Sequence, residues 1–350
     1  MNYSDTLTPG CYAERFLPAM DRLVSRKWGV FNHFLYFGEP GATDGPRKFF
    51  RRGVGYDTPA AMWNARVDEV DVDKLVADLQ EMGAGYYFLT LMQGSRYMLA
   101  PNAVYDEITG CRPGEACAER DLPMEIADAL AKAGIDFYLY FTGDGPWTDP
   151  EAGGRMGYVA PRGPENPVSD TFVRNWTSVL REYAVRYGSR VRGWWIDGMY
   201  DWDVNLYRPH QLELYHDAVL AGNPDALVAL NNGVRPEYLK YARRDTFTCG
   251  EFSDFTTVPP KRFVDDTQTH LLAPLGRQEP GSPNPGWGQP GAKRPKEYLL
   301  SFLRLAGAVG MPVTFDIRCF GDGRVPNEFD REQFETLRWV GRQLAAGEPA

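Results

Sequence analysis

The sequence predicts an α/β fold, a (β/α)8 barrel formed by a single domain that spans residues 1–350. Short apolar runs of strand length alternate with helical segments along the whole chain, and eight such runs are present. This alternation is typical of a parallel sheet, and eight strands close a barrel of this type. The longest connections follow the predicted strands, as do the loops that build the active-site face of such barrels.

The predicted strands are short apolar runs, and the predicted helices lie between them or after the last one. The strands are residues 28–34, 86–91, 136–140, 193–196, 227–231, 246–250, 270–275 and 312–317. The helices are residues 72–82, 122–133, 170–187, 209–220, 236–243, 295–309 and 330–344. Asp170 and Asp330 are expected to cap two helices, and Gly83, Gly134 and Gly188 stand where three helices are expected to end.

Long connections rich in glycine, proline and aromatic residues follow several predicted strands. They comprise residues 35–63, 92–121 and 142–169. A fourth connection, residues 274–294, contains five prolines and five glycines. It is predicted to be an ordered loop over the same face, with a disordered linker as the alternative. No internal repeat and no second strand pattern indicates a further domain, and we expect no C-terminal β-sandwich.

The composition excludes several classes of function. A net charge of −9 provides no basic footprint for nucleic acid. No stretch approaches the roughly 18 apolar residues of a membrane span, and the N-terminus lacks the apolar core of a signal peptide, so we expect a cytoplasmic protein. The four histidines and five cysteines show no metal-ligand spacing. We therefore expect neither a metal nor a cofactor.

Residues 193–202 carry the strongest chemical signal. Trp194, Trp195 and Ile196 predict a buried strand that ends at Asp197, where a glycine lets the chain turn. A buried carboxylate is costly unless it is hydrogen-bonded or used. Aromatic rings beside a carboxylate suit a sugar-cleaving site, because sugars stack on the rings while the carboxylate meets the anomeric carbon. The alternative is a structural aspartate that caps the next helix.

A second carboxylate, Glu251, follows the sixth predicted strand. Because the carboxyl ends of barrel strands converge, we expect Glu251 to face Asp197 across one substrate. Retaining glycosidases use two carboxylates about 5–5.5 Å apart, one as nucleophile and one as acid/base. Asp197 is therefore the predicted nucleophile and Glu251 the predicted acid/base, with Asp254 as the competing acid. Weaker candidates are Asp201, Asp203 and Asp316.

Several motifs resemble the α-L-fucosidase family of glycoside hydrolases, family 29. Residues 27–34, Lys-Trp-Gly-Val-Phe-Asn-His-Phe, are similar to that family's first-strand motif. Residues 193–198 resemble its nucleophile strand, and the Asn-Asn pair at 231–232 matches the pair after its fifth strand. The resemblance covers roughly residues 15–345. It implies a (β/α)8 barrel and a retaining mechanism through a glycosyl-enzyme ester, with Asp197 as nucleophile and Glu251 as acid/base.

One motif departs from the family pattern. After the second strand the family carries Lys-His-His-Asp-Gly-Phe, whose histidines hold the fucose hydroxyls, whereas residues 91–97 here are Leu-Met-Gln-Gly-Ser-Arg-Tyr. Gln93 can form paired hydrogen bonds to neighbouring hydroxyls, and Arg96 offers a planar cation suited to a carboxylate or sulfate. Arg96 is expected to pair either with a protein carboxylate or with an anionic sugar. We therefore expect a sugar pocket that differs from a fucose pocket.

Together these observations predict a retaining exo-glycosidase that acts on an oligosaccharide or glycoside. The predicted substrate-binding residues are His33, Gln93, Arg96, Tyr97, Trp195, Tyr200, Asn231 and Trp287. Two alternatives stay open: a carbohydrate-binding or degenerate barrel without hydrolytic activity, and a barrel hydrolase or isomerase that acts on a sugar acid. The sequence assigns neither the sugar, nor the linkage, nor the oligomeric state.

Overall fold

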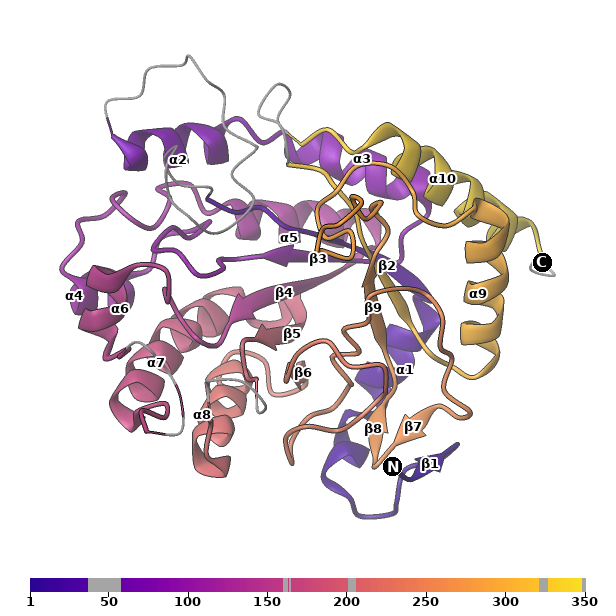
Figure 1. Cartoon of the computed structure of the whole chain (residues 1–350), viewed down its shortest axis with the longest axis horizontal. Helices are drawn as coiled ribbons and strands as arrows, with labels where there is room; N and C mark the ends of the chain where they lie inside the picture. The colour runs from indigo at the N-terminus through magenta and orange to yellow at the C-terminus, as the bar shows by residue number, and fades with distance from the viewer. Residues whose placement is uncertain (37–57, 160–162, 164, 201–205, 321–326, 348–350) are drawn as a thin grey trace.

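The computed structural model describes residues 1–36, 58–159, 163, 165–200, 206–320 and 327–347. Its centre is a curled sheet of seven parallel strands in the spatial order β6-β5-β4-β3-β2-β10-β9 (Figure 1). The strands are β2 (Trp28–Asn32), β3 (Tyr86–Thr90), β4 (Asp136–Thr142), β5 (Val191–Asp197), β6 (Leu227–Leu230), β9 (Leu271–Pro274) and β10 (Val313–Asp316). Each matches a strand predicted from the sequence.

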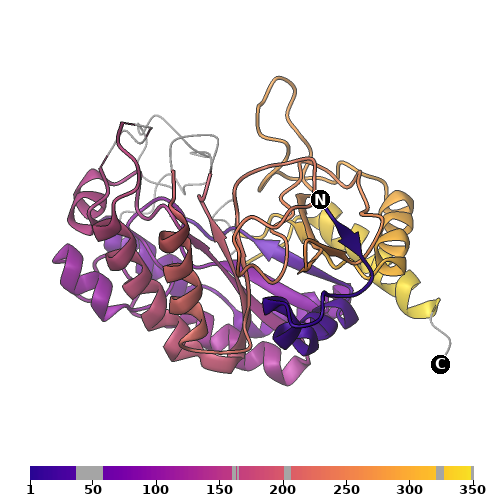
Figure 2. The same ribbon diagram turned by 90° about the horizontal axis from the view of Figure 1, so that it is seen from below.

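Most helices cover the outer side of the curled sheet, whereas the first helix and the 3-10 turn before it pack Phe16, Met20 and Leu23 against side chains inside the sheet (Figures 1 and 2). The helices are α1 (Leu17–Ser25), α2 (Pro59–Asp68), α3 (Val72–Met82), α4 (Ala103–Thr109), α5 (Leu122–Ala133), α6 (Pro150–Met156), α7 (Asp170–Tyr187), α8 (Pro209–Leu220), α9 (Lys296–Ala308) and α10 (Arg331–Ala346), with the 3-10 turns η1 (Tyr12–Phe16) and η3 (Gly188–Arg190). Within the described residues, no helix is long and apolar enough to cross a lipid bilayer.

Helix ends follow the expected capping chemistry with one correction. Asp330 caps α10 by accepting a hydrogen bond from a backbone amide of the first turn. Gly83 and Gly134 end α3 and α5 with left-handed backbone angles. Asp170, in contrast, is the first residue of α7, and Ser169 is its cap, because the Ser169 hydroxyl accepts the Phe172 amide at 3.1 Å.

Alternating side chains of the strands fill the inside of the curled sheet. An inner cluster is formed by aromatic residues such as Phe31 of β2, Phe88 of β3, Tyr140 of β4 and Trp195 of β5. A larger apolar cluster lies between the sheet and the helices. The indole of Trp195 stacks on the Tyr140 ring, with the centroids 5.3 Å apart. The inner aromatic residues therefore pack directly beneath the polar residues at the strand ends.

Two predicted elements differ from the structure. Residues 236–243 form no helix, because long-range contacts hold this segment: the Tyr238 ring packs on Phe252 and its hydroxyl donates to the carbonyl of Thr257. Residues 246–250 do not form a continuous strand. The Thr246 amide bonds to Val228 of β6, and the Leu272 amide of β9 bonds to the carbonyl of residue 250. The segment thus bonds to both edge strands of the sheet.

A small antiparallel sheet that the sequence did not predict lies beside the main sheet. It consists of β1 (Tyr3–Ser4), β7 (Phe263–Val264) and β8 (Thr267–Gln268) in the order β1-β7-β8. Phe247 forms an isolated parallel bridge to Gln268 of β8. The small sheet therefore supports the segment that leads to Glu251.

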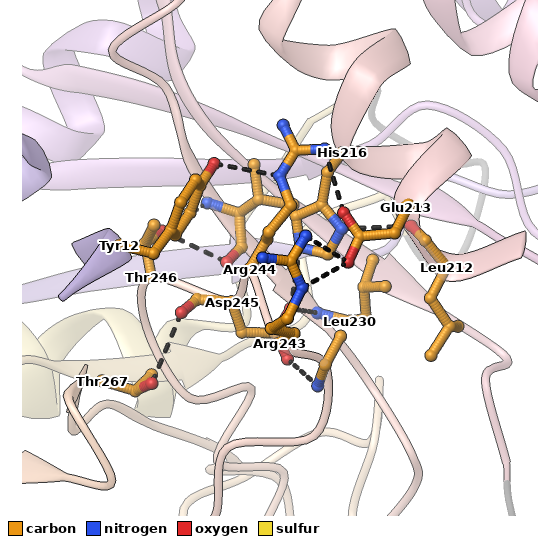
Figure 3. Close-up of polar contacts among 12 residues, drawn as sticks. Tyr12, Leu212, Glu213, His216, Leu230, Arg243, Arg244, Asp245, Thr246 and Thr267 are labelled. Atoms are coloured by element: carbon orange, nitrogen blue, oxygen red, sulfur yellow. Dashed lines mark hydrogen bonds and ion pairs between the residues drawn. The ribbon is translucent and has the colours of Figure 1, made fainter. Parts of the chain in front are cut away.

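A buried polar cluster also fixes this segment (Figure 3). Asp245 Oδ1 lies 3.1 Å from His216 Nε2 of α8 and accepts the Leu230 amide of β6, while its Oδ2 accepts the Ala242 amide at 2.7 Å. The side chains of Asp245 and His216 are both almost fully buried. Asp245 therefore joins α8, β6 and the approach to Glu251 at one point.

Replacing Asp245 with alanine should lower the free energy of unfolding by about 3–5 kcal/mol, because the change leaves His216 and two backbone amides buried without an acceptor. Urea unfolding followed by circular dichroism measures the loss. The control is Asp217→Ala, which removes an exposed ion pair with Arg244 and should change stability by less than about 1 kcal/mol. Equal losses in the two variants would contradict the structural role of Asp245.

Candidate active site

A cavity of about 290 Å³ lies at the carboxyl ends of the parallel strands. Of the predicted site residues, it brings together those at the ends of strands and on the loop after β9. The predicted residues that line it are His33, Gln93, Trp195, Asp197, Tyr200, Glu251 and Trp287. Asn231 contacts both carboxylates from the adjacent wall.

Asp197 is the last residue of β5, and three donors surround its buried carboxylate. The Tyr140 hydroxyl donates to Oδ2 at 2.5 Å, and the Asn231 amide donates to Oδ1 at 2.8 Å. The Tyr200 hydroxyl donates to the same Oδ1 at 3.3 Å. These hydrogen bonds stabilise the negative charge and offset the cost of removing it from water.

Glu251 meets Asp197 through a shared amide. Asn231 Nδ2 donates to Glu251 Oε2 at 2.5 Å and to Asp197 Oδ1 at 2.8 Å, so the two oxygens can be no more than about 5.3 Å apart. The two carboxyl groups are therefore close enough to face one substrate. Asn231 is itself fixed, because its backbone amide bonds to the Ile196 carbonyl and its Oδ1 accepts the amide of residue 233.

The backbone approach to Glu251 requires glycine at position 250. Gly250 has a φ of 57°, and a Cβ atom there would lie 1.8 Å from the carbonyl oxygen of His270. Directly after this glycine the chain pairs with β9, through a parallel bridge between Glu251 and Leu272. Close contact with β9 therefore sets the direction in which the Glu251 side chain enters the cavity.

The environment of Glu251 favours its protonated form. Burial and the negative charge of Asp197 raise the pKa of Glu251 to about 8, and the hydrogen bond from Asn231 only partly opposes this shift. Burial and the Asp197 charge also raise the pKa of Tyr140, so its hydroxyl remains a donor. At neutral pH the raised pKa keeps the Glu251 carboxyl protonated, beside an Asp197 side chain that accepts three hydrogen bonds.

Asp254, the competing acid, lies in an ion pair outside the cavity. The guanidinium of Arg294 donates two hydrogen bonds to Asp254 Oδ2, at 2.5 and 3.1 Å. Partial burial alone would raise the pKa of Asp254, but Arg294 and the Phe255 amide lower it below its ordinary value. Asp201 and Asp203 lie outside the described residues.

His33 and Trp287 form one wall of the cavity and are joined by Asp316. His33 Nδ1 lies 3.0 Å from Asp316 Oδ1, and Asp316 Oδ2 accepts the Gly288 amide at 3.0 Å. The rings of His33 and Trp287 lie edge to face, with centroids 6.1 Å apart. Lys293 also holds the loop by donating to backbone carbonyls at 253 and 285. Asp316 thus positions its neighbours through both carboxylate oxygens.

Arg96 and Tyr97 are not among the described residues that line the cavity. Arg96 instead donates two hydrogen bonds to Asp149, at 2.5 and 2.9 Å, and one to Glu151 at 3.0 Å. Of the two partners expected for this guanidinium, the structure shows the protein carboxylate. The Tyr97 ring packs on Tyr36, with centroids 3.9 Å apart. Both side chains therefore serve loop packing in this structure.

Sequence reasoning did not identify Tyr140 as part of the site. The signal was present, because Tyr140 ends a predicted strand and lies on the same face of it as Tyr138. Other unpredicted lining residues are Phe31, Leu35, Leu272, Asn284, Gly288, Ile317, Arg318, Cys319 and Phe320. Within the described part of the chain, no group of three or more histidine, cysteine, aspartate or glutamate residues could hold a metal ion.

No family model and no curated protein sequence matches this chain. Solved structures of glycoside hydrolases are similar to it in fold. The endo-fucoidan hydrolase MfFcnA4 of glycoside hydrolase family 107 has a TM-score of 0.66 and 14% identity, over 93% of this chain and 54% of that one. The chain thus spans about half the length of that hydrolase.

Two α-L-fucosidases are also similar in fold. A family 29 enzyme from Bacteroides thetaiotaomicron has a TM-score of 0.63 and 16% identity, over 99% of this chain and 77% of that one. AlfC from Lactobacillus casei has a TM-score of 0.57 and 17% identity, over 94% and 98% of the two chains. At these identities the likeness shows a fucosidase-like fold.

Replacing Asp197 with asparagine should lower the pKa of Glu251 by about one unit or more, because the neighbouring negative charge is removed while the volume is kept. Carbon-13 NMR of protein labelled at glutamate side-chain carboxyls measures the titration. Asp254→Asn is the control, since it removes a carboxylate paired with Arg294 and should leave Glu251 unchanged. An unaltered Glu251 titration in Asp197→Asn would show that the two groups are not coupled.

Proposed function

We propose that the protein is a retaining exo-glycosidase, with Asp197 as nucleophile and Glu251 as acid/base. The observation that carries the proposal is the carboxylate pair on one Asn231 amide, inside a cavity with aromatic walls. A carboxylate that accepts three hydrogen bonds beside an acid with a raised pKa suits the two roles of a retaining mechanism.

In the first step the Asp197 carboxylate attacks the anomeric carbon and forms a glycosyl ester. Glu251 gives its proton to the glycosidic oxygen as the carbon–oxygen bond breaks, so the leaving group departs as a neutral alcohol. In the second step the Glu251 carboxylate takes a proton from water as the water oxygen attacks the same carbon. The ester bond breaks, and both residues return to their starting states.

The remaining residues orient the sugar and the nucleophile. Tyr140, Tyr200 and Asn231 hold the Asp197 oxygens. Hydrogen bonding of Nδ1 to Asp316 leaves His33 Nε2 for a sugar hydroxyl, and Gln93 lines the same cavity. We further infer that the segment 246–252 closes the curled sheet into a (β/α)8 barrel, which would fix Glu251 opposite the nucleophile.

An α-L-fucoside is the first substrate to test, because the similar structures include α-L-fucosidases and a fucoidan hydrolase. The absence of the two family histidines at 92–93 favours a wider screen. Aryl α-L-fucosides, α-L-arabinosides, β-D-galactosides and uronides cover neutral and acidic sugars. A barrel that only binds carbohydrate is the alternative, and it would bind a sugar of this screen without cleaving any glycoside.

Replacing Asp197 with alanine should reduce kcat for the best aryl glycoside by several orders of magnitude, because no ester can form. Sodium azide fits the space left by the carboxylate and should restore turnover, giving a glycosyl azide of inverted anomeric configuration. Product analysis by NMR identifies it. Asp254→Ala is the matched control and should retain wild-type activity. Full activity of Asp197→Ala without azide would rule out the proposed nucleophile.

Replacing Glu251 with glutamine should abolish cleavage of glycosides with poor leaving groups, whereas activated aryl glycosides should keep more activity because they need no proton. In the wild type the acid must be protonated. Its contribution to kcat/KM is therefore present below the pKa of about 8 and is lost as the pH rises through it. That alkaline limb should vanish in Glu251→Gln. Equal losses for both leaving-group classes would point to a different acid.

A further inference from the structure

Trp147 lies in the connection between β4 and α6, and 47% of its surface is exposed. Tryptophan is mostly buried in folded proteins, because its large apolar area is costly to leave in water. The tryptophans of the strands and of α2 and α7 follow this rule. An indole has a large apolar face and one polar N–H group, so an exposed indole can contact a ligand.

The indole lies against the turn that forms part of the cavity wall. A Cβ atom on Gly94 would lie 3.0 Å from Trp147 Nε1, so the ring edge packs on the backbone of Gly94. Gly94 has a φ of 70°, which also favours glycine. The preceding residue, Gln93, lines the cavity. Trp147 itself is not among the lining residues, and it contacts the immediate neighbour of one.

Several hydrogen bonds hold the Trp147 loop on this turn. The amide and hydroxyl of Thr148 both donate to the Gly94 carbonyl, at 2.8 and 2.6 Å. The paired hydrogen bonds between Arg96 and Asp149 add a second attachment two residues from the indole. A ring held in place loses little conformational entropy when a ligand covers it. The position of Trp147 is therefore suited to binding.

The volume of the cavity limits how many sugar units of a substrate can lie inside it. A volume of about 290 Å³ is at the lower end of the range for ligand sites, about 300–1,000 Å³, and leaves room for one sugar unit. In the exo-cleavage proposed above, the terminal sugar fills this space. The unit bonded to it must then lie at the mouth of the cavity, beside the residues that form the rim.

We propose that Trp147 is the stacking platform for the leaving-group sugar, which makes oligosaccharides the substrate class of this site. The apolar face of the second sugar covers the exposed indole, while the first sugar reaches Asp197 and Glu251. This assignment rests on the proposed function. It gives Arg96 and Thr148 a positioning role, because they hold the loop and do not contact the substrate.

The test compares three donors that share the sugar best accepted in the aryl screen: the glycosyl fluoride, the 4-nitrophenyl glycoside and the disaccharide with galactose as leaving group. Fluoride is too small to cover the indole, whereas the other two leaving groups are rings. Trp147→Ala should lower kcat/KM about tenfold for the ring leaving groups and less than about twofold for the fluoride. Trp147→Phe should restore most of the loss.

Leu305→Ala on α9 is the matched control, because Leu305 is an exposed apolar residue far from α6 (Figure 1), and it should leave all three values unchanged. Thermal unfolding checks that each variant is folded. Equal losses of Trp147→Ala for fluoride and ring leaving groups, or no loss at all, would overturn the platform while the proposed function stands. A wild-type protein that cleaves none of the donors would overturn both.

Discussion

One amide group joins the two carboxyl groups of the candidate site, because Asn231 donates to both Asp197 and Glu251 and so holds them close together inside the protein. Two such groups so close together cannot both be ionised without a large energetic penalty, and one of them therefore keeps a proton. The tyrosine hydroxyls decide which one. Both donate to Asp197, which leaves Glu251 as the group that carries the proton.

The fold could be predicted wherever local pattern and tertiary environment agree. Buried strands such as β4 and β5 are continuous apolar runs, and their ends are marked by polar residues. Residues 236–252 could not be predicted in this way. Their backbone follows contacts to distant partners, above all the ion pair of Asp245 with His216, and such contacts override local preference. Short helices such as α4 and α6 depend similarly on packing.

The geometry of the candidate site was predicted best where a polar residue ends a strand. Asp197 and Asn231 follow directly from that rule, since parallel strands bring their carboxyl ends together. Arg96 lies on a loop, and its partners Asp149 and Glu151 lie at the start of α6, more than fifty residues away. No periodic pattern relates two loops, so the choice between a protein partner and a substrate partner could be made only from the structure.

The hydrogen bonds that join those two connections also limit which substitutions the chain can accept. Arg96, Asp149 and the Thr148 contacts to Gly94 make the connections after β3 and β4 a single unit. A variant that lost Arg96 would leave Asp149 without its guanidinium partner, and one that lost Gly94 would displace the neighbouring indole. Changes in one loop thus require compensating changes in the other. Substitutions in these two loops should therefore occur as covarying sets of residues.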